Sequence, residues 1–200
     1  MKKFKGYDAA RERANFAGTS KLPVGGYVMK VQDVRYEEGA DGNSDKIVVA
    51  YDVAEGEFKD FFKKQFEENT NEDKKWKGKT IIYVPRDDGS EKDEWTQNTF
   101  AKWTAAFEDS NDGYKWDWKE EKWKGLLVGI VYGETGTVIE GKEVTYTEAR
   151  YPIAVQSIRA NKFKAARFKA KNGYTGTANS AGSANDFVAI PEGTEEEIPF

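Results

Sequence analysis

The feature that most constrains the fold of this 200-residue chain is a change in the spacing of its apolar residues. Apolar residues alternate with others over 27–31 and again over 46–53, as in strands that bury one face, and we expect these strands to pair as a hairpin. The stretch 79–85 predicts a third strand. Over 95–108 the apolar spacing becomes helical, and 125–133 is apolar enough for a strand buried on both faces.

The rest of the pattern completes a small β structure. Residues 55–79 predict a short helix followed by a loop. Gly141 and Lys142 predict a two-residue hairpin turn, with strands near 143–149 and 151–158 after it. Three strands, one helix and two more strands follow the order of the OB-fold, a partly open barrel that often binds oligonucleotides. We therefore expect a mainly β, OB-fold-like five-stranded barrel with one helix between strands 3 and 4. An SH3-like barrel or another small β-barrel shares most of this order.

The composition removes most routes to catalysis. The chain has neither Cys nor His, so disulfides, thiol nucleophiles, imidazole bases and the usual zinc ligands are excluded. Asp87 and Asp88 could bind a metal, but a solvated turn is the simpler interpretation. The sequence KGKT at 77–80 ends like a phosphate-binding loop, yet Asp73 stands where that loop needs a glycine. We expect no catalytic residue, no metal and no cofactor.

Charge divides the chain into a nearly neutral body and an acidic tail. All 31 Lys and Arg residues lie at or before Lys171, and 172–200 holds five of the 35 acidic residues. Such an asymmetry is typical of interaction tails, and the small polar residues after Lys171 predict a flexible, disordered linker. We divide the chain into a polar lead-in 1–22, an OB-like domain 23–160, a basic segment 161–171, a flexible linker 172–191 and an acidic tip 192–200.

Aromatic and basic residues are interleaved from 58 to 79, which favours binding of single-stranded nucleic acid. Such binding combines base stacking on aromatic rings, worth about 1–3 kcal/mol per base, with cations that follow the phosphates. Six acidic residues in 57–79 favour the alternative that these rings are core and the charges only solvated. The candidates for stacking are Phe61, Phe62, Trp76 and Tyr83. The candidates for phosphate contacts are Lys63, Lys64, Lys74, Lys75, Lys77, Lys79 and Arg86.

A second candidate for phosphate binding is the segment 159–171, which holds six basic residues and no acidic one. Its affinity for phosphates would depend on salt. The alternative is a polar helix that seals the barrel with its apolar side, and the two interpretations are compatible. The candidate cations are Arg159, Lys162, Lys164, Arg167, Lys169 and Lys171.

The chain ends in an acidic run, two apolar residues and a proline: Glu195, Glu196, Glu197, Ile198, Pro199 and Phe200. This ending resembles the C-terminal tip of bacterial single-stranded DNA-binding proteins, the SSB family, in which an acidic run precedes Ile-Pro-Phe. The layout of OB domain, low-complexity linker and acidic tip is similar too. In the body, "LPVGGYVMKVQDVRYEEG" and "YDVAEGEFKDFF" resemble phage-encoded proteins of replication and recombination modules.

The resemblance implies a phage-encoded protein that coats single-stranded DNA during replication, recombination and repair. Its tip would recruit exonucleases, helicases or primases, and recombination mediators. The physical chemistry of the tip agrees. A receptor can bury the Phe200 ring and pair its carboxylate with Arg or Lys. Pro199 biases Ile198 toward an extended conformation, and the acidic residues steer the tip toward a basic rim.

Three alternatives stay open. The barrel could bind protein, in a recombination accessory or adaptor protein, or it could bind RNA. A metal-dependent nuclease could use Asp87, Asp88 or other carboxylates. No apolar run is long enough for a signal peptide or a membrane span, so we expect a soluble, cytoplasmic protein, in the host cytoplasm if phage-encoded. Homo-oligomerisation also stays open.

Overall fold

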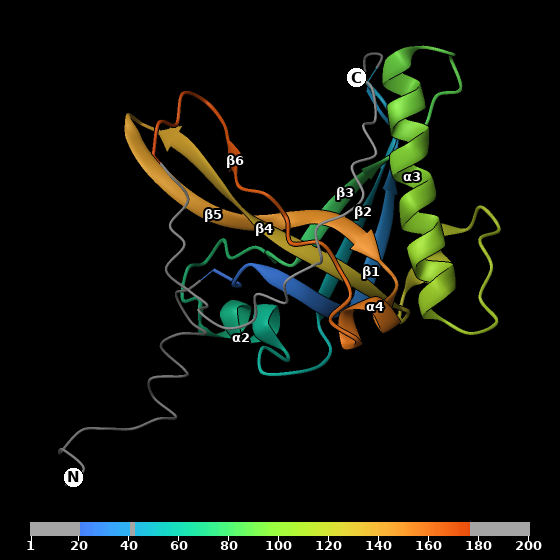
Figure 1. The fold of residues 1–200 in the computed structure, drawn as a ribbon, viewed down its shortest axis with the longest axis horizontal. Coiled ribbons are helices and arrows are strands. Elements are labelled where there is room, and N and C mark those ends of the chain that lie inside the picture. Colours follow the sequence, from blue (N-terminus) through green and yellow to red (C-terminus); the bar gives the residue numbers. More distant parts are fainter. Residues whose placement is uncertain (1–20, 41–42, 177–200) are drawn as a thin grey trace, which may run out of the picture.

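The computed structural model describes residues 21–40 and 43–176, which form a mainly β domain, as predicted. Its strands lie in one six-stranded mixed sheet, with α3 running along one side (Figure 1). No helix in this part of the chain has the length and apolar character needed to cross a membrane. The elements are β1 Gly25–Glu37, β2 Lys46–Val53, α2 Phe61–Glu68, β3 Lys79–Tyr83, α3 Glu91–Ser110, the 3-10 helix η1 Glu120–Trp123, β4 Leu127–Ile139, β5 Lys142–Ile153, α4 Val155–Arg159 and β6 Lys169–Ala170.

The sheet has the order β3-β2-β1-β4-β5 with antiparallel neighbours, and β6 pairs in parallel with β4. The predicted hairpin of the first two strands is confirmed, and α3 lies between the third and fourth strands of the chain. The sheet is not closed into the expected five-stranded barrel, because β3 and β5 do not pair within the described residues. The side chains of Leu22, Phe61 and Phe62 line the space between these two edges. They lie where a closed barrel would have backbone hydrogen bonds between β3 and β5.

Helix α3 covers the sheet with large apolar side chains. Phe100, Trp103 and Phe107, predicted as one helical stripe, are all buried in the main core. The helix begins earlier than predicted because Ser90 caps it, its side-chain oxygen accepting the backbone N–H of Asp93. Acidic residues in the first turn add a favourable interaction with the helix dipole.

Strands β4 and β5 form a long hairpin that extends away from α3 as an arm (Figure 1). The predicted turn at Gly141 and Lys142 is wrong by one residue, because Ile139 pairs with Lys142 and the turn residues are Glu140 and Gly141. Both have positive φ, 50° and 74°, the backbone of a type I′ turn. The two strands predicted after the turn are one strand, β5, and the chain then enters α4.

Replacing Glu140 by Asn is expected to raise the free energy of unfolding by about 0.5–1 kcal/mol. Glutamate is strained at this positive φ, whereas Asn tolerates the left-handed conformation and Asn-Gly is the preferred pair of type I′ turns. Urea denaturation measures the difference. The control is Glu140→Ala, which removes the same charge and keeps the strain. An equal gain in both variants would assign the effect to charge and contradict the turn argument.

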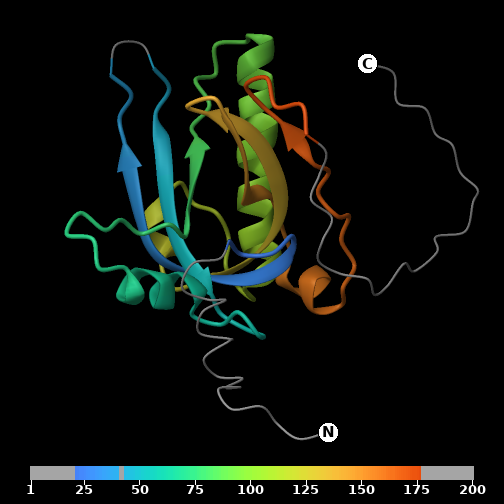
Figure 2. The same ribbon diagram turned by 90° about the vertical axis from the view of Figure 1, so that its left-hand side faces the viewer.

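Residues 160–176, which we call the strap, run from the end of α4 toward the β4–β5 arm and pack on glycines of β1 and β4 (Figure 2, orange to red). Glycines in the two strands allow the close approach. A Cβ on Gly26 would lie 2.7 Å from the ring of Phe163, and one on Gly136 would lie 2.6 Å from the ring of Tyr174. The strap therefore packs apolar side chains on the sheet, and it consists of turns, irregular chain and the short strand β6 instead of the helix considered from the sequence.

The strap includes the first residues of the segment that the sequence assigns to the linker. Tyr174 packs against Phe168, with ring centroids 5.6 Å apart. The backbone N–H and the hydroxyl of Thr175 both donate to Oε1 of Glu143, at 2.8 and 2.7 Å. The chain is thus attached to the end of the β4–β5 arm as far as Thr175.

Candidate nucleic-acid interface

A buried carboxylate of β2 fixes the start of α2. The side chain of Asp52 accepts the backbone N–H groups of Val53, Phe62 and Lys63, at 2.8, 2.9 and 2.9 Å. Asp60 stands at the N-cap position and makes no side-chain cap, so Asp52 satisfies the first N–H groups of the helix from the neighbouring strand. Burial raises the pKa of the Asp52 carboxyl above its ordinary value, although these hydrogen bonds act in the opposite direction.

This anchorage turns two predicted stacking residues into core residues. Phe61 and Phe62 are only 2% and 6% exposed. Their rings pack edge to face with centroids 5.2 Å apart, and Phe62 also contacts the buried ring of Tyr51. Phe61 and Phe62 therefore belong to the core, and their small exposed area does not favour the predicted stacking on bases.

Trp76, another predicted stacking residue, holds the loop after α2 in place. Its Nε1–H donates to the carbonyl oxygens of Tyr51 and Gly78, at 3.1 and 2.9 Å. Its half-buried ring packs against the ring of Phe66. A Cβ on Gly78 would lie 2.4 Å from the carbonyl oxygen of Tyr51. The loop is thus fixed to β2 on both sides of Lys77, and Trp76 acts as its anchor.

The predicted cations of this region are exposed and available to an anion. Within the described residues no ion pair involves Lys63, Lys64 or a lysine from 74 to 79. Nζ of Lys74 lies 4.7 Å from the centre of the Phe66 ring, which leaves its charge at the surface. Four of these cations are close in sequence and form what we call the lysine row: Lys74, Lys75, Lys77 and Lys79.

The lysine row borders a groove of 350 Å³ between β3 and β5, the unpaired edges of the sheet. Lys77 and Lys79 line it from the β3 side, and Glu148 lines it from β5. The negative charge of Glu148 is balanced by Arg150 and Lys171, at 2.7 and 3.2 Å. The β3 side of the groove is therefore cationic, and the β5 side is internally neutralised.

Beyond Lys79, the outward face of β3 becomes apolar and then aromatic. Ile81 and Tyr83 are 45% and 51% exposed, whereas Ile82 between them is buried. This alternation is that of a strand with one face in solvent. Tyr83 lies opposite Lys46 of β2. One strand therefore presents a cation, an apolar side chain and an aromatic ring in succession on the same face.

The end of β3 leads into a second hollow, of 720 Å³, which also borders the β1–β2 hairpin and the first turns of α3. We call it the Tyr83–Trp95 pocket. Besides Tyr83 and Arg86, which the sequence analysis proposed, it is lined by Lys46, Lys92 and Trp95, which that analysis missed. A signal for Trp95 was present, because this residue does not fit the period of the buried α3 stripe.

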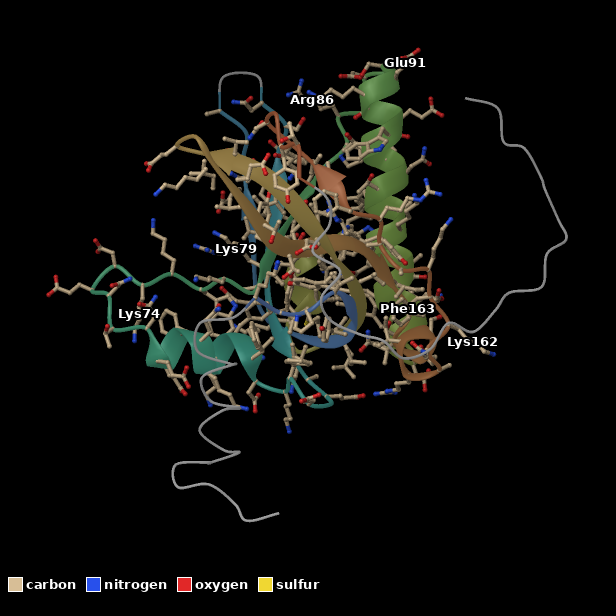
Figure 3. All side chains as sticks on the ribbon, turned by 60° about the vertical axis from the view of Figure 1, so that its left-hand side comes forward. Lys74, Lys79, Arg86, Glu91, Lys162 and Phe163 are labelled. Atoms are coloured by element: carbon tan, nitrogen blue, oxygen red, sulfur yellow. The ribbon has the colours of Figure 1, made fainter. Side chains whose placement is uncertain are left out.

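Hydrogen bonds organise the connection between β3 and α3. Oδ1 of Asp93 accepts the backbone N–H of Arg86 at 2.7 Å, and this bond holds the pKa of Asp93 below its ordinary value. Hydrogen bonds from Ser90 likewise lower the pKa of Asp88. Arg86 is therefore fixed near the first turn of α3, close to Glu91 (Figure 3).

The structure brings only the end of the basic segment near the groove beside the lysine row, where Lys171 pairs with Glu148. Figure 3 shows Lys162 on the opposite side of the molecule from Lys74 and Lys79. Arg159 is occupied by an ion pair with Glu55, at 2.5 Å. The other proposed cations of this segment are Lys162, Lys164, Arg167 and Lys169, which are exposed, and Lys171, which is partly buried.

The carboxylates of the nuclease alternative, Asp87 and Asp88, belong to no group of three His, Cys, Asp or Glu side chains that could hold a metal ion, as far as residues 21–40 and 43–176 are concerned. The Asp88 side chain instead accepts the backbone N–H of Ser90 at 2.9 Å. In the described structure this acidic pair therefore belongs to the turn before α3.

The proposed partner-binding residues, 195–200, lie outside the described residues. No protein-family model and no curated protein matches the chain. The function proposed below therefore rests on the surface of the described domain and on the sequence of the tip.

Proposed function

We propose that the described residues form an OB-like domain that binds single-stranded DNA without sequence preference, and that the acidic tip recruits enzymes of replication, recombination and repair. The sheet order supports the first part. The order β3-β2-β1-β4-β5 contains the strand pairs of a five-stranded OB barrel, except for the pair of β3 with β5 that would close it. Helix α3 lies between the third and fourth strands of the chain, as in that fold. OB-folds bind oligonucleotides on the face of strands 2 and 3, the face that carries Tyr83 and Lys79.

The observation that carries this proposal is the lysine row leading to Tyr83. Single strands bind where a cationic surface follows the backbone and aromatic rings receive the bases. Here four exposed cations free of ion pairs within the described residues lie beside a strand whose outward face ends in a half-exposed ring. We propose no reaction at this surface, so the protein would act by binding in the cytoplasm.

Titration with oligo-dT tests the proposal. Quenching of tryptophan fluorescence is expected at low salt, with log K falling against log salt at a slope of about −3 if the four lysines each contact one phosphate. Absence of binding at low salt would overturn the proposal and favour the adaptor alternative. Oligo-U competition ranks RNA against DNA, and a preference for oligo-U would replace DNA by RNA as the ligand.

Replacing Phe200 by Ala is expected to weaken binding of tip-dependent partners at least about 10-fold, because buried aromatic anchors dominate small interfaces. Single-strand binding by the described domain should stay unchanged. Co-purification with a candidate exonuclease or helicase, beside the oligo-dT titration, measures both. The matched control is Phe168→Ala, which removes a ring from the strap and leaves the tip intact. Unchanged partner binding by Phe200→Ala would contradict the recruiting role.

A further inference from the structure

Two exposed aromatic rings of the domain lack the partners that the others have. Among the described residues the large exposed aromatic side chains are Tyr36, Tyr83, Trp95 and Trp118, at 44, 51, 65 and 76%. The hydroxyl of Tyr36 donates to Asp45, and Trp118 stacks on Phe100 with the ring planes 14° apart. Within the described part of the chain, Tyr83 and Trp95 have no ring contact and no side-chain hydrogen bond.

Both of these rings line the same hollow, the Tyr83–Trp95 pocket, although they come from β3 and α3. Lys46, Arg86 and Lys92 line it as well, and Glu38 is the one acidic residue among its described lining. Lys46 is paired with Glu37 at 3.0 Å, whereas Lys92 forms no ion pair with a described residue. The described lining thus combines two rings that have no ring contact with a described residue with three basic side chains and one acidic side chain.

This combination matches the two parts of a nucleotide. A base stacks on exposed aromatic faces, and a phosphate is attracted by Arg and Lys. The volume of 720 Å³ lies within the range of small-ligand sites. A purely apolar peptide would not need basic side chains such as Lys92 beside the rings. The pocket also lies at the end of β3, where a strand that follows the lysine row would arrive (Figure 3, from Lys74 past Lys79 to Arg86).

We propose that the Tyr83–Trp95 pocket holds one nucleotide of the bound single strand, with its base against Tyr83 and Trp95 and its phosphate near Arg86 and Lys92. This inference rests on the proposed function and makes it more specific. The lysine row would bind the backbone of any strand, whereas the pocket would bind a base. The contribution of the pocket should therefore disappear when the ligand has no bases.

Trp95→Ala tests the inference, with Trp118→Ala as the matched control for loss of an exposed indole outside the pocket. Trp95→Ala is expected to weaken binding of oligo-dT about 10-fold. It should leave binding of an abasic oligonucleotide of the same length unchanged. Trp118→Ala should change neither. Trp95 is largely exposed, so folding is expected to survive, and circular dichroism checks this.

The outcomes separate this inference from the proposed function. Wild-type protein that binds no oligo-dT overturns both. Wild-type protein that binds while Trp95→Ala equals Trp118→Ala overturns the pocket alone. Equal losses for oligo-dT and the abasic strand also overturn it, because the effect would not come from a base. A free nucleotide has the same chemistry, so dTMP is added as competitor. Saturation of the pocket by micromolar dTMP would assign it to free nucleotides and not to the strand.

Discussion

Replacing Lys77 and Lys79 together by Gln is expected to weaken binding of oligo-dT by about 50-fold at about 50 mM salt and about 7-fold at about 200 mM salt. The reason is counterion release. Each phosphate neutralised on a single strand contributes about 0.7 to the slope of log K against log salt, so two lost contacts lower the slope by about 1.4. The two lysines lie on either side of Gly78, where the loop is fixed to β2, so their loss should leave the fold intact.

Two control pairs make this result specific. Lys102 and Lys119 are exposed and have no ion pair with a described residue, and they lie outside the lysine row. Their replacement by Gln should reduce affinity far less. Replacing Lys162 and Lys164 tests the strap, on the other side of the molecule. If replacing Lys162 and Lys164 lowers the affinity for oligo-dT and replacing Lys77 and Lys79 does not, the assignment of the binding surface to β3 is contradicted.

Replacing Trp123 by Ala is expected to lower the free energy of unfolding by about 3–5 kcal/mol, the range of large-to-small aromatic changes in a core. Trp123 is fully buried, and its ring stacks on Phe107 of α3 with centroids 4.5 Å apart and planes 19° apart. It therefore joins the 3-10 helix η1 to α3. The chain just after it is also joined to β1, since the N–H of Gly125 donates to the carbonyl of Val31 at 3.0 Å.

Urea denaturation followed by circular dichroism measures this loss. Trp118→Ala is the matched control, because it removes the same side chain from the same loop at a position that is 76% exposed. Its effect should stay below about 1 kcal/mol, as is usual for surface positions. Similar losses in the two variants would show that the indole at 123 does not stabilise the core more than an exposed one.

The spacing of apolar residues predicted those strands and helices in which one face is buried and the other is exposed. The alternation in β1 and β2 and the stripe of Phe100, Trp103 and Phe107 record which face of an element is buried, so both were found from the sequence. The turn at Glu140 and Gly141 was placed one residue late. Gly141 indicated the turn correctly, but glycine can occupy either central position of a two-residue turn. The register of β4 and β5 places Gly141 at the second position.

The candidate nucleic-acid interface was harder to predict, because contacts between segments distant in sequence determine which of its residues are exposed. The local sequence around Phe61 and Phe62 does not tell whether a ring beside lysines is buried. The carboxylate of Asp52 decides this by fixing the start of α2 from β2. Trp95 and Lys46 come from different elements that meet only in the folded domain, so no local motif connects them.

The strap has a practical consequence for anyone who wishes to isolate this domain. A polypeptide cut after residue 160 would still contain every strand of the antiparallel sheet, yet it would lose Phe163 from Gly26, Ala166 from Gly133, and Phe168 and Tyr174 from Gly136. The backbone at Gly136 would then be open to water, and Gly26 and Gly133 would be covered only by Ile158 and Arg150. The shortest stable form of the domain should therefore extend through Thr175. A protein fused after Thr175 would start at the end of the β4–β5 arm, beside Glu143.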